Sequence, residues 1–308
     1  MDSADTRSRV IPSSPAGSGG DERQATGTVR SAAAAPSTRH LRPGLMAQAL
    51  DHLLLPSVAA WFAFPQRFDR AVAQLAQRGG RAVSPRQAAA HFGGSLFLQI
   101  DPRILTHRLD EKYVDADGWH WIGESFLDAG DWQDRLPLLQ RSPAHREIVE
   151  ICRTRENFRD GGRYRTYLRQ IGDGKPPRRN GQTIDTVDKL DAYFRYYADL
   201  IDNIERTGIL PRNRFQRATN TGRQPRRARS FWQDFVERDI GVAIDKDGRL
   251  VRHTSGKHRL AAAIGLGLEK VPVEIRMVHL GWLQAEMQKR RLPASKALAA
   301  ALAERGAG

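Results

Sequence analysis

The residues with the most unusual chemistry form a short basic turn that consists of Gly256, Lys257, His258 and Arg259. Leu260, Ile264 and the alanines between them follow at helical spacing, so the basic turn is expected to begin a helix. The start of a helix already carries unpaired N–H groups and the positive end of the macrodipole, and each cation there costs about 0.3–1 kcal/mol. Three consecutive basic side chains therefore indicate that an anion binds against them, and phosphate is the usual ligand of such a site.

The candidate phosphate-binding residues are Ser255, Gly256, Lys257, His258 and Arg259. Gly256 would let an anion approach the backbone closely, because glycine has no side chain. His258 is the only residue of the basic turn suited to proton transfer near pH 7, which makes it a candidate catalytic residue. Two other interpretations stay open, a solvated basic turn or an Arg259 that pairs with a carboxylate elsewhere in the fold.

Two runs of alternating apolar residues precede the basic turn, from Gly241 to Ile244 and from Arg249 to His253. The residues between them end in Gly248, a glycine that allows the tight turn of a β-hairpin. Thr254 and Ser255 follow, and their hydroxyls are expected to cap the helix that begins at the basic turn.

The helix is expected to end at Gly267, which suits a left-handed C-terminal cap. Beyond it, apolar residues from Val271 to Met277 alternate with Pro272, Glu274 and Arg276, a pattern that predicts another strand. The whole segment is therefore expected to fold as a β-hairpin, a helix and a strand.

This segment resembles the phosphate-binding segment of the ParB/sulfiredoxin superfamily. The resemblance rests on residues 255–263 and 267–273, because the superfamily has a strand, a Gly-x-x-Arg turn, a helix, a Gly-Leu pair and a Val-Pro-Val-type strand. Residues 200–210 are also similar to the helix that ends in Gly-Ile-Leu in ParB N-terminal domains. The resemblance covers roughly residues 188–279.

The resemblance implies that the basic turn binds CTP or ATP, and that a phosphoryl group is transferred in some members. It carries a phosphate-contact role to His258 and Arg259. Lys257 stands where sulfiredoxins have cysteine, so their repair chemistry is not implied. Fewer than 30 residues follow His279, so the helix-turn-helix of ParB partition proteins is not implied either.

A second candidate catalytic residue is Asp131, in the element Gly130-Asp131-Trp132. This element, together with the basic turn and Trp282, is similar to an uncharacterised group of prokaryotic proteins. In that light Asp131 is a candidate acid, base or metal ligand that folding brings near the turn. A structural aspartate that caps a helix remains the alternative.

The composition is that of a globular protein with a strong excess of positive charge. The 308 residues include 49 Lys and Arg against 35 Asp and Glu, a formal net charge of +14, which favours anionic partners such as nucleotides, nucleic acid or a membrane surface. Codon bias toward arginine could account for part of this excess. The single cysteine, Cys152, excludes a disulfide within the chain and is consistent with a reducing, cytoplasmic location.

The domain organisation is predicted from changes in composition along the chain. Residues 1–43 have the composition of a disordered tail, and residues 44–180 are expected to form a mainly helical region. Residues 181–290 are expected to form a ParB/sulfiredoxin-like domain, and residues 291–308 a C-terminal helix. The apolar run from Leu45 to Gln77 contains Pro56 and Pro65, so it is too interrupted to span a bilayer. A mainly helical N-terminal region together with a mixed-sheet domain predicts the α+β fold class.

Residues 212–229 are expected to be a basic insertion in the ParB-like domain, with no acidic residue. Its arginines could clamp a triphosphate or follow a nucleic-acid backbone, although a solvated loop is the plain alternative. The candidate nucleic-acid-binding residues are Arg212, Arg214, Arg217, Arg223, Arg226, Arg227 and Arg229.

The leading functional hypothesis is an NTP-dependent phosphotransferase or NTPase with an unknown acceptor. The sequence predicts no metal site of its own, because His253 and His258 flank the turn without a third ligand. Mg²⁺ would enter with the nucleotide. The alternatives are a non-enzymatic DNA- or RNA-binding protein that uses the arginine-rich segments, and a nucleotide-gated interaction module.

Overall fold

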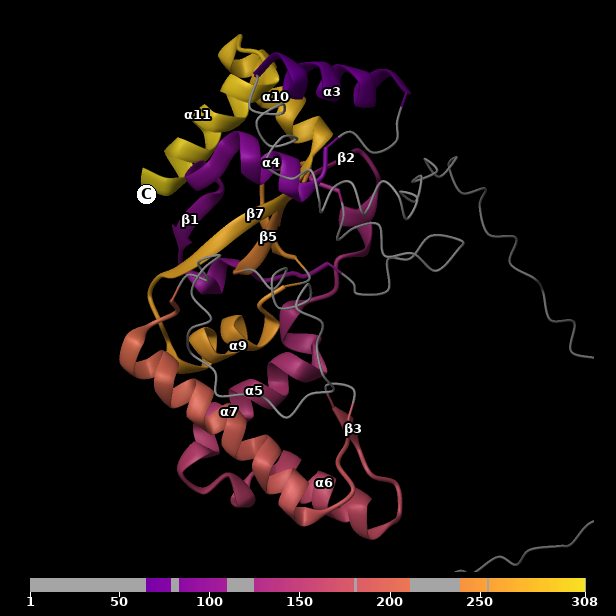
Figure 1. The fold of residues 1–308 in the computed structure, drawn as a ribbon, viewed down its shortest axis with the longest axis vertical. Coiled ribbons are helices and arrows are strands. Elements are labelled where there is room, and N and C mark those ends of the chain that lie inside the picture. Colours follow the sequence, from indigo (N-terminus) through magenta and orange to yellow (C-terminus); the bar gives the residue numbers. More distant parts are fainter. Residues whose placement is uncertain are drawn as a thin grey trace, which may run out of the picture. The chain divides into compact units, whose positions relative to one another are not determined.

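A computed structural model describes residues 65–78, 83–109, 125–179, 182–210, 239–253 and 255–307. The predicted tail 1–43, most of the apolar run that begins at Leu45, and the basic insertion 212–229 lie outside these residues. The described residues confirm the α+β class, with one mixed sheet between two groups of helices (Figure 1). Within them, no helix is long and apolar enough to cross a membrane.

The sheet is organised around its longest strand, β7 (Val271–His279). One edge of β7 pairs in parallel with β5 (Ile240–Ile244), which forms an antiparallel hairpin with β6 (Leu250–Arg252). The other edge pairs at its start with antiparallel β1 (Phe97–Ile100) and at its end with parallel β2 (Leu127–Asp128). All nine residues of β7 are buried, as expected of a strand covered on both faces.

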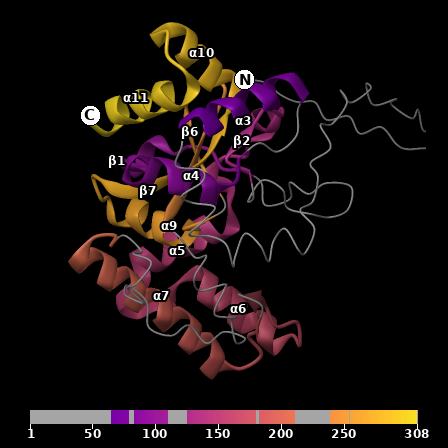
Figure 2. The same ribbon diagram turned by 45° about the horizontal axis from the view of Figure 1, so that its top comes forward.

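The two helical groups lie at opposite sides of the sheet in both views (Figures 1 and 2). One group consists of α3 (Pro65–Arg78), α4 (Pro85–Phe92), α10 (Leu280–Arg290) and α11 (Ala294–Ala307). The other consists of α5 (Pro143–Thr154), α6 (Gly162–Gly172), α7 (Val187–Thr207) and α9 (Lys257–Leu266). We call this second set the lower helical group.

The predicted hairpin, helix and strand are confirmed, because β5, β6, α9 and β7 follow one another in that order. Gly248 and Gly267 adopt the positive φ angles that the turn and the helix end require, 81° and 71°. The predicted C-terminal helix is also confirmed as α11, with Leu298 and Leu302 buried.

The boundary expected near residue 180 does not divide two compact units. Strands β1 and β2 come from the N-terminal region, yet they pair with β7 from the C-terminal region. One hydrophobic cluster runs from Phe68 to Leu302, and all described residues fall within a single unit, Thr38–Gly308. The reason is that β7 needs partners on both edges, and the C-terminal region supplies only β5 for one of them.

Helix α9 packs tightly against α5 through Gly265. An ideal Cβ on Gly265 would lie 2.7 Å from Cys152 Sγ and 3.1 Å from Cys152 Cβ, closer than normal packing allows. Burial raises the pKa of the Cys152 thiol to about 11, so the thiol is neutral and acts as a packing group. The absence of a side chain at Gly265 therefore sets how closely the two helices approach.

Gly265→Ala is expected to lower the free energy of unfolding by about 1–3 kcal/mol, because the added methyl group overpacks the helix contact. Chemical denaturation measures this change. The matched control is Gly172→Ala at the end of α6, where an added Cβ meets nothing within 4 Å. Cys152→Ala should partly rescue the Gly265→Ala protein, and strictly additive effects would contradict the proposed clash.

Candidate functional site

The basic turn lies at the N-terminus of α9 and packs against the first residues of β5. Gly256 is the N-terminal cap of α9 and has a left-handed conformation, with φ 72°. An ideal Cβ at this position would be 2.6 Å from Ile240 Cα, so no larger residue fits without movement of the strand. The first turn of α9 contains no acidic residue, as expected from the sequence.

The expected capping by hydroxyl groups is wrong for Ser255, and Thr254 lies outside the described residues. Within the part of the chain that the structure describes, no side chain forms a capping hydrogen bond at the N-terminus of α9. The Ser255 hydroxyl instead donates to the backbone carbonyl of Asp239, at 3.0 Å. Its role is therefore to hold the basic turn against the start of β5, because the left-handed Gly256 turns the chain so that Ser255 faces the strand.

Arg259 is buried, with 6% of its surface exposed. Its Nη1 atom lies 3.6 Å from Asp239 Oδ1, whose side chain is also buried, and 3.4 Å from the Leu210 carbonyl oxygen. The pairing with a distant carboxylate, left open by the sequence, is thus present in the fold. The described contacts of Arg259 use Nη1, and they fix the guanidinium in one orientation beside the basic turn.

His258 is half-buried and contacts a residue that the sequence assigned only to the core. Its Nδ1 atom lies 3.1 Å from the hydroxyl oxygen of Tyr197 on α7, and the two rings meet edge to face at 5.0 Å. Tyr197 is completely buried, as its place in the apolar stripe of α7 predicts. The sequence could have indicated a second role for Tyr197 through its hydroxyl, because a buried tyrosine hydroxyl normally has a hydrogen-bond partner.

The two described residues on either side of residues 211–238, which contain the basic insertion, also lie at the site. Leu210 precedes residues 211–238 and Asp239 follows them, and both contact Arg259. The seven candidate arginines between 212 and 229 belong to this undescribed segment. The described residues on either side of this segment, Leu210 and Asp239, therefore lie beside the basic turn.

A group of buried polar residues lies next to the turn on one face of the sheet. An ideal Cβ on Gly241 would be 2.5 Å from Ser255 Oγ, 2.8 Å from Arg276 Cδ and 3.3 Å from His253 Cβ. His253, Arg276 and the neighbouring Glu274 on β7 are exposed by 0%, 9% and 4%. Sequence reasoning did not include Arg276 in the site, because the site becomes visible only when β5 pairs with β7.

Asp131 is not brought near the basic turn, which corrects the expectation from the sequence. It is exposed and precedes the 3-10 helix Trp132–Arg135, without capping it through its side chain. The preceding strand β2 pairs Asp128 with His279, whereas Val273 pairs with Ile240 beside the turn. Val273 and His279 are six residues apart on β7, which corresponds to about 20 Å along a strand. Asp131, which follows Asp128, and the basic turn, which packs on Ile240, therefore lie toward opposite ends of β7.

The Gly-Asp-Trp element instead packs against the end of β7, where its residues contact His279. His279 Nδ1 accepts a hydrogen bond from the Gly281 N–H at 3.0 Å, and its ring lies 5.9 Å from that of Trp132. Burial lowers the pKa of His279, and a hydrogen bond with the Gly130 backbone and the Asp128 charge offset this only in part. His279 therefore connects the Gly-Asp-Trp element to the start of α10.

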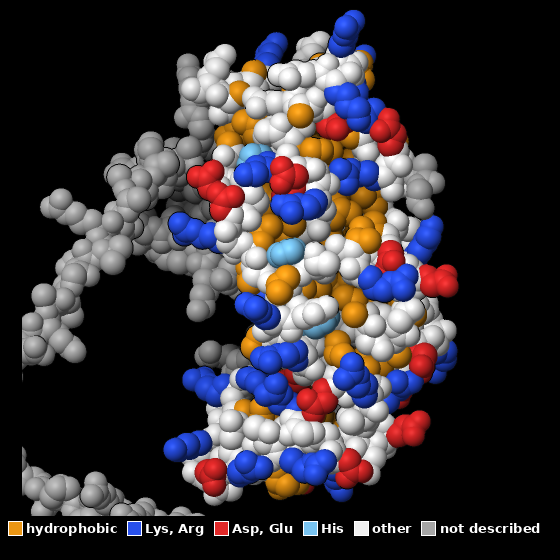
Figure 3. Space-filling view, turned by 180° about the vertical axis from the view of Figure 1, so that it is seen from behind, with side chains coloured by type: hydrophobic (Ala, Val, Ile, Leu, Met, Phe, Trp, Pro, Cys, Tyr) orange, Lys and Arg blue, Asp and Glu red, His pale blue; other side chains and the backbone are white. Residues whose placement is uncertain are grey.

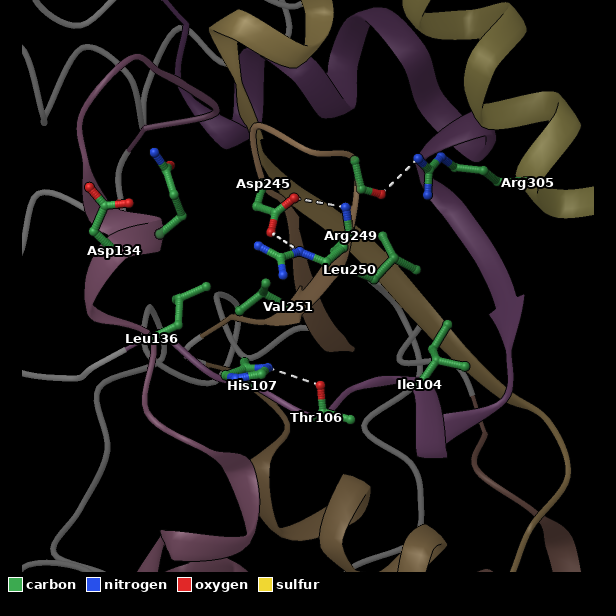
Figure 4. A pocket seen from close by; sticks show the side chains of 12 residues that line it. Ile104, Thr106, His107, Asp134, Leu136, Asp245, Arg249, Leu250, Val251 and Arg305 are labelled. Atoms are coloured by element: carbon green, nitrogen blue, oxygen red, sulfur yellow. Dashed lines mark hydrogen bonds and ion pairs between the residues drawn. The ribbon is translucent and has the colours of Figure 1, made fainter.

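A separate pocket of about 470 Å³ lies at the turn of the β5–β6 hairpin, away from the start of β5 (Figure 4). Its charged side chains are paired within the hairpin and its neighbours. Asp245 accepts from the Arg249 backbone and side chain, both at 2.8 Å, and Arg305 donates to the Gly248 carbonyl, also at 2.8 Å. These contacts stabilise the hairpin. Among the described residues, no group of His, Cys, Asp or Glu is arranged to hold a metal ion.

The unfolding free energy is expected to decrease as the pH falls below about 6.5, the usual pKa of histidine. Burial lowers the pKa values of His279 and His145, so below pH 6.5 the unfolded chain binds protons that the folded chain excludes. Urea denaturation from pH 5 to 8 measures this slope. His279→Gln should reduce the slope, and an identical slope in this variant would contradict the assignment.

No family model matches this chain, and no curated protein or solved structure matches it either. The structure establishes the α+β class and the placement of the basic turn. The ParB/sulfiredoxin-like assignment remains a prediction that rests on the motif residues.

Proposed function

We propose that the chain is a nucleotide-binding protein of the ParB/sulfiredoxin type, whose basic turn holds the phosphates of ATP or CTP. The observation that carries this proposal is the α9 N-terminus, where three basic residues follow a left-handed glycine that packs directly on β5. The backbone N–H groups and helix dipole favour an anion there, and Lys257, His258 and Arg259 add charge or hydrogen-bond donors.

The contacts around the turn support a preorganised site. Arg259 is oriented by Asp239 and Leu210, and His258 is oriented by Tyr197. Donors that are fixed before a ligand arrives do not have to reorganise when charge develops on a phosphate oxygen. This arrangement supports phosphoryl transfer to an acceptor or to water, with Mg²⁺ supplied together with the nucleotide. Asp131 has no part in this proposal, because it lies toward the other end of β7.

ATP, CTP or GTP is expected to raise the melting temperature of the protein, because a ligand that binds only the folded state stabilises it. Lys257→Ala should weaken this shift and Arg259→Ala should abolish it. Because Arg259 is buried and paired, its variant must first give a cooperative melting transition without nucleotide. Lys246→Ala is the control, since Lys246 pairs with Asp134 near the separate pocket.

The absence of a shift with every nucleoside tri- and diphosphate would exclude the proposed nucleotide site. An equal shift in the wild type, Lys257→Ala and Arg259→Ala proteins would place the nucleotide elsewhere on the chain.

A second candidate function, nucleic-acid binding, is supported by arginines of the lower helical group. Figure 3 shows Lys and Arg side chains gathered over the lower half of the back face, with acidic side chains among them. Arg146 and Arg153 on α5 and Arg169 on α6 are exposed, and within the described residues no carboxylate pairs with them. Unpaired arginines of this kind can contact phosphates of a nucleic-acid backbone.

If these arginines bind duplex DNA, affinity should fall steeply with salt, and each phosphate-contacting arginine should contribute about 0.9 to the log–log slope. Arg146→Ala, Arg153→Ala and Arg169→Ala together should therefore lower the slope, as measured by fluorescence anisotropy. Arg155→Ala is the control, because Arg155 already pairs with Asp202 and Glu205. A slope unchanged by the triple substitution would exclude a phosphate-contact role for these three arginines.

A further inference from the structure

The contact between His258 and Tyr197 links the direction of one hydrogen bond to the tautomer of the histidine. The Tyr197 hydroxyl oxygen is 3.1 Å from His258 Nδ1, a hydrogen-bond distance. In a neutral imidazole one nitrogen donates and the other accepts, so the direction of this hydrogen bond fixes the tautomer. The tautomer in turn decides what His258 can offer to a ligand.

The position of His258 disfavours the charged imidazolium. It is in the first turn of α9, where the helix dipole is positive, and Lys257 precedes it; the charge of Arg259, which follows it, is offset by its ion pair with Asp239. Nearby positive charges disfavour protonation of a histidine. A tyrosine hydroxyl keeps its proton up to about pH 10, so it is available as a donor to a neutral imidazole.

We propose that Tyr197 donates its hydroxyl hydrogen to Nδ1 and holds His258 as the neutral tautomer with hydrogen on Nε2. Tyr197 is then a positioning residue. His258 presents Nε2–H as a donor to an anionic oxygen, and its Nδ1 lone pair is occupied. This deepens the proposed phosphate site, on which it rests for the identity of the anion, and it replaces the proton-transfer role predicted for His258.

Tyr197 is itself held by contacts within the lower helical group. Its ring meets those of Tyr193 and Tyr196 edge to face, at 5.0 and 5.1 Å. The Tyr193 hydroxyl donates to the carboxylate of Glu147 on α5, and Glu147 is only 3% exposed. The tyrosine that orients His258 is therefore fixed by a packed aromatic cluster that is anchored to α5.

The test is ¹⁵N NMR of the histidine side chains at pH 7 in the full chain without ligand. We expect His258 to show an unprotonated, hydrogen-bonded Nδ1 and a protonated Nε2. In Tyr197→Phe the hydrogen-bond shift of Nδ1 should be lost and the Nδ1–H tautomer should become populated. The control is Tyr164→Phe, which removes another buried hydroxyl, bonded to Asp191 at 2.6 Å, without contact to His258.

A wild-type His258 that is doubly protonated, or that carries its hydrogen on Nδ1, would overturn the proposal whether or not Tyr197→Phe folds. The same NMR signals in the wild type and a folded Tyr197→Phe protein would also overturn it. Because no ligand is present, these outcomes do not depend on the proposed function. They therefore distinguish a failed tautomer assignment from a failed nucleotide site.

Binding of inorganic phosphate and of ATP then tests the role of the donor. Tyr197→Phe should weaken binding about 2- to 10-fold, the effect of one hydrogen bond, while Tyr164→Phe should bind as the wild type. His258→Gln, whose amide nitrogen can replace Nε2–H as a donor, should bind more tightly than His258→Ala. Equal binding by these two His258 variants would contradict a donor role at Nε2. If the wild type binds neither probe, the proposed function fails while the tautomer result stands.

Discussion

The arrangement of the candidate site depends on the close contact between the basic turn and the first residues of β5. Gly256 has φ 72°, and only its lack of a side chain lets it lie against the backbone of Ile240. The same contact brings Ser255 to the carbonyl of Asp239 and places Arg259 beside the Asp239 carboxylate. A shift of the turn away from β5 would therefore disrupt the backbone packing, the hydroxyl contact and the orientation of the arginine together.

The buried pair of Arg259 and Asp239 does not by itself argue for or against an anion. The attraction within a buried ion pair offsets the cost of removing two charges from water only where the geometry is excellent, and the pair also fixes the geometry of the arginine. Here the separation is 3.6 Å, longer than a charge-assisted hydrogen bond of about 2.7–2.9 Å. Asp239 thus orients Arg259 through an ion pair that is longer than a hydrogen bond, which is compatible with a guanidinium that also contacts a phosphate.

At the opposite end of β7, the contacts hold the strand to its neighbouring elements. His279, Gly281 and the Gly130 backbone form a joint that links β2, β7 and α10, and the pocket nearby is bordered by charges that stabilise the hairpin. One long strand therefore connects two regions of different character. The end near Ile240 carries the basic turn and buried polar residues, whereas the end at His279 carries the element that the sequence had associated with catalysis.

The sequence by itself determined the local elements and the unusual charge at the start of α9, because caps, glycines and apolar spacing act over a few residues. Only the tertiary structure decided which distant residues meet. The contact of Tyr197 with His258, the pairing of Asp239 with Arg259 and the distance of Asp131 from both depend on strand register and helix packing. These cannot be read from spacing along the chain, because residues tens of positions apart become neighbours only when β5 and β7 pair and α7 packs near α9.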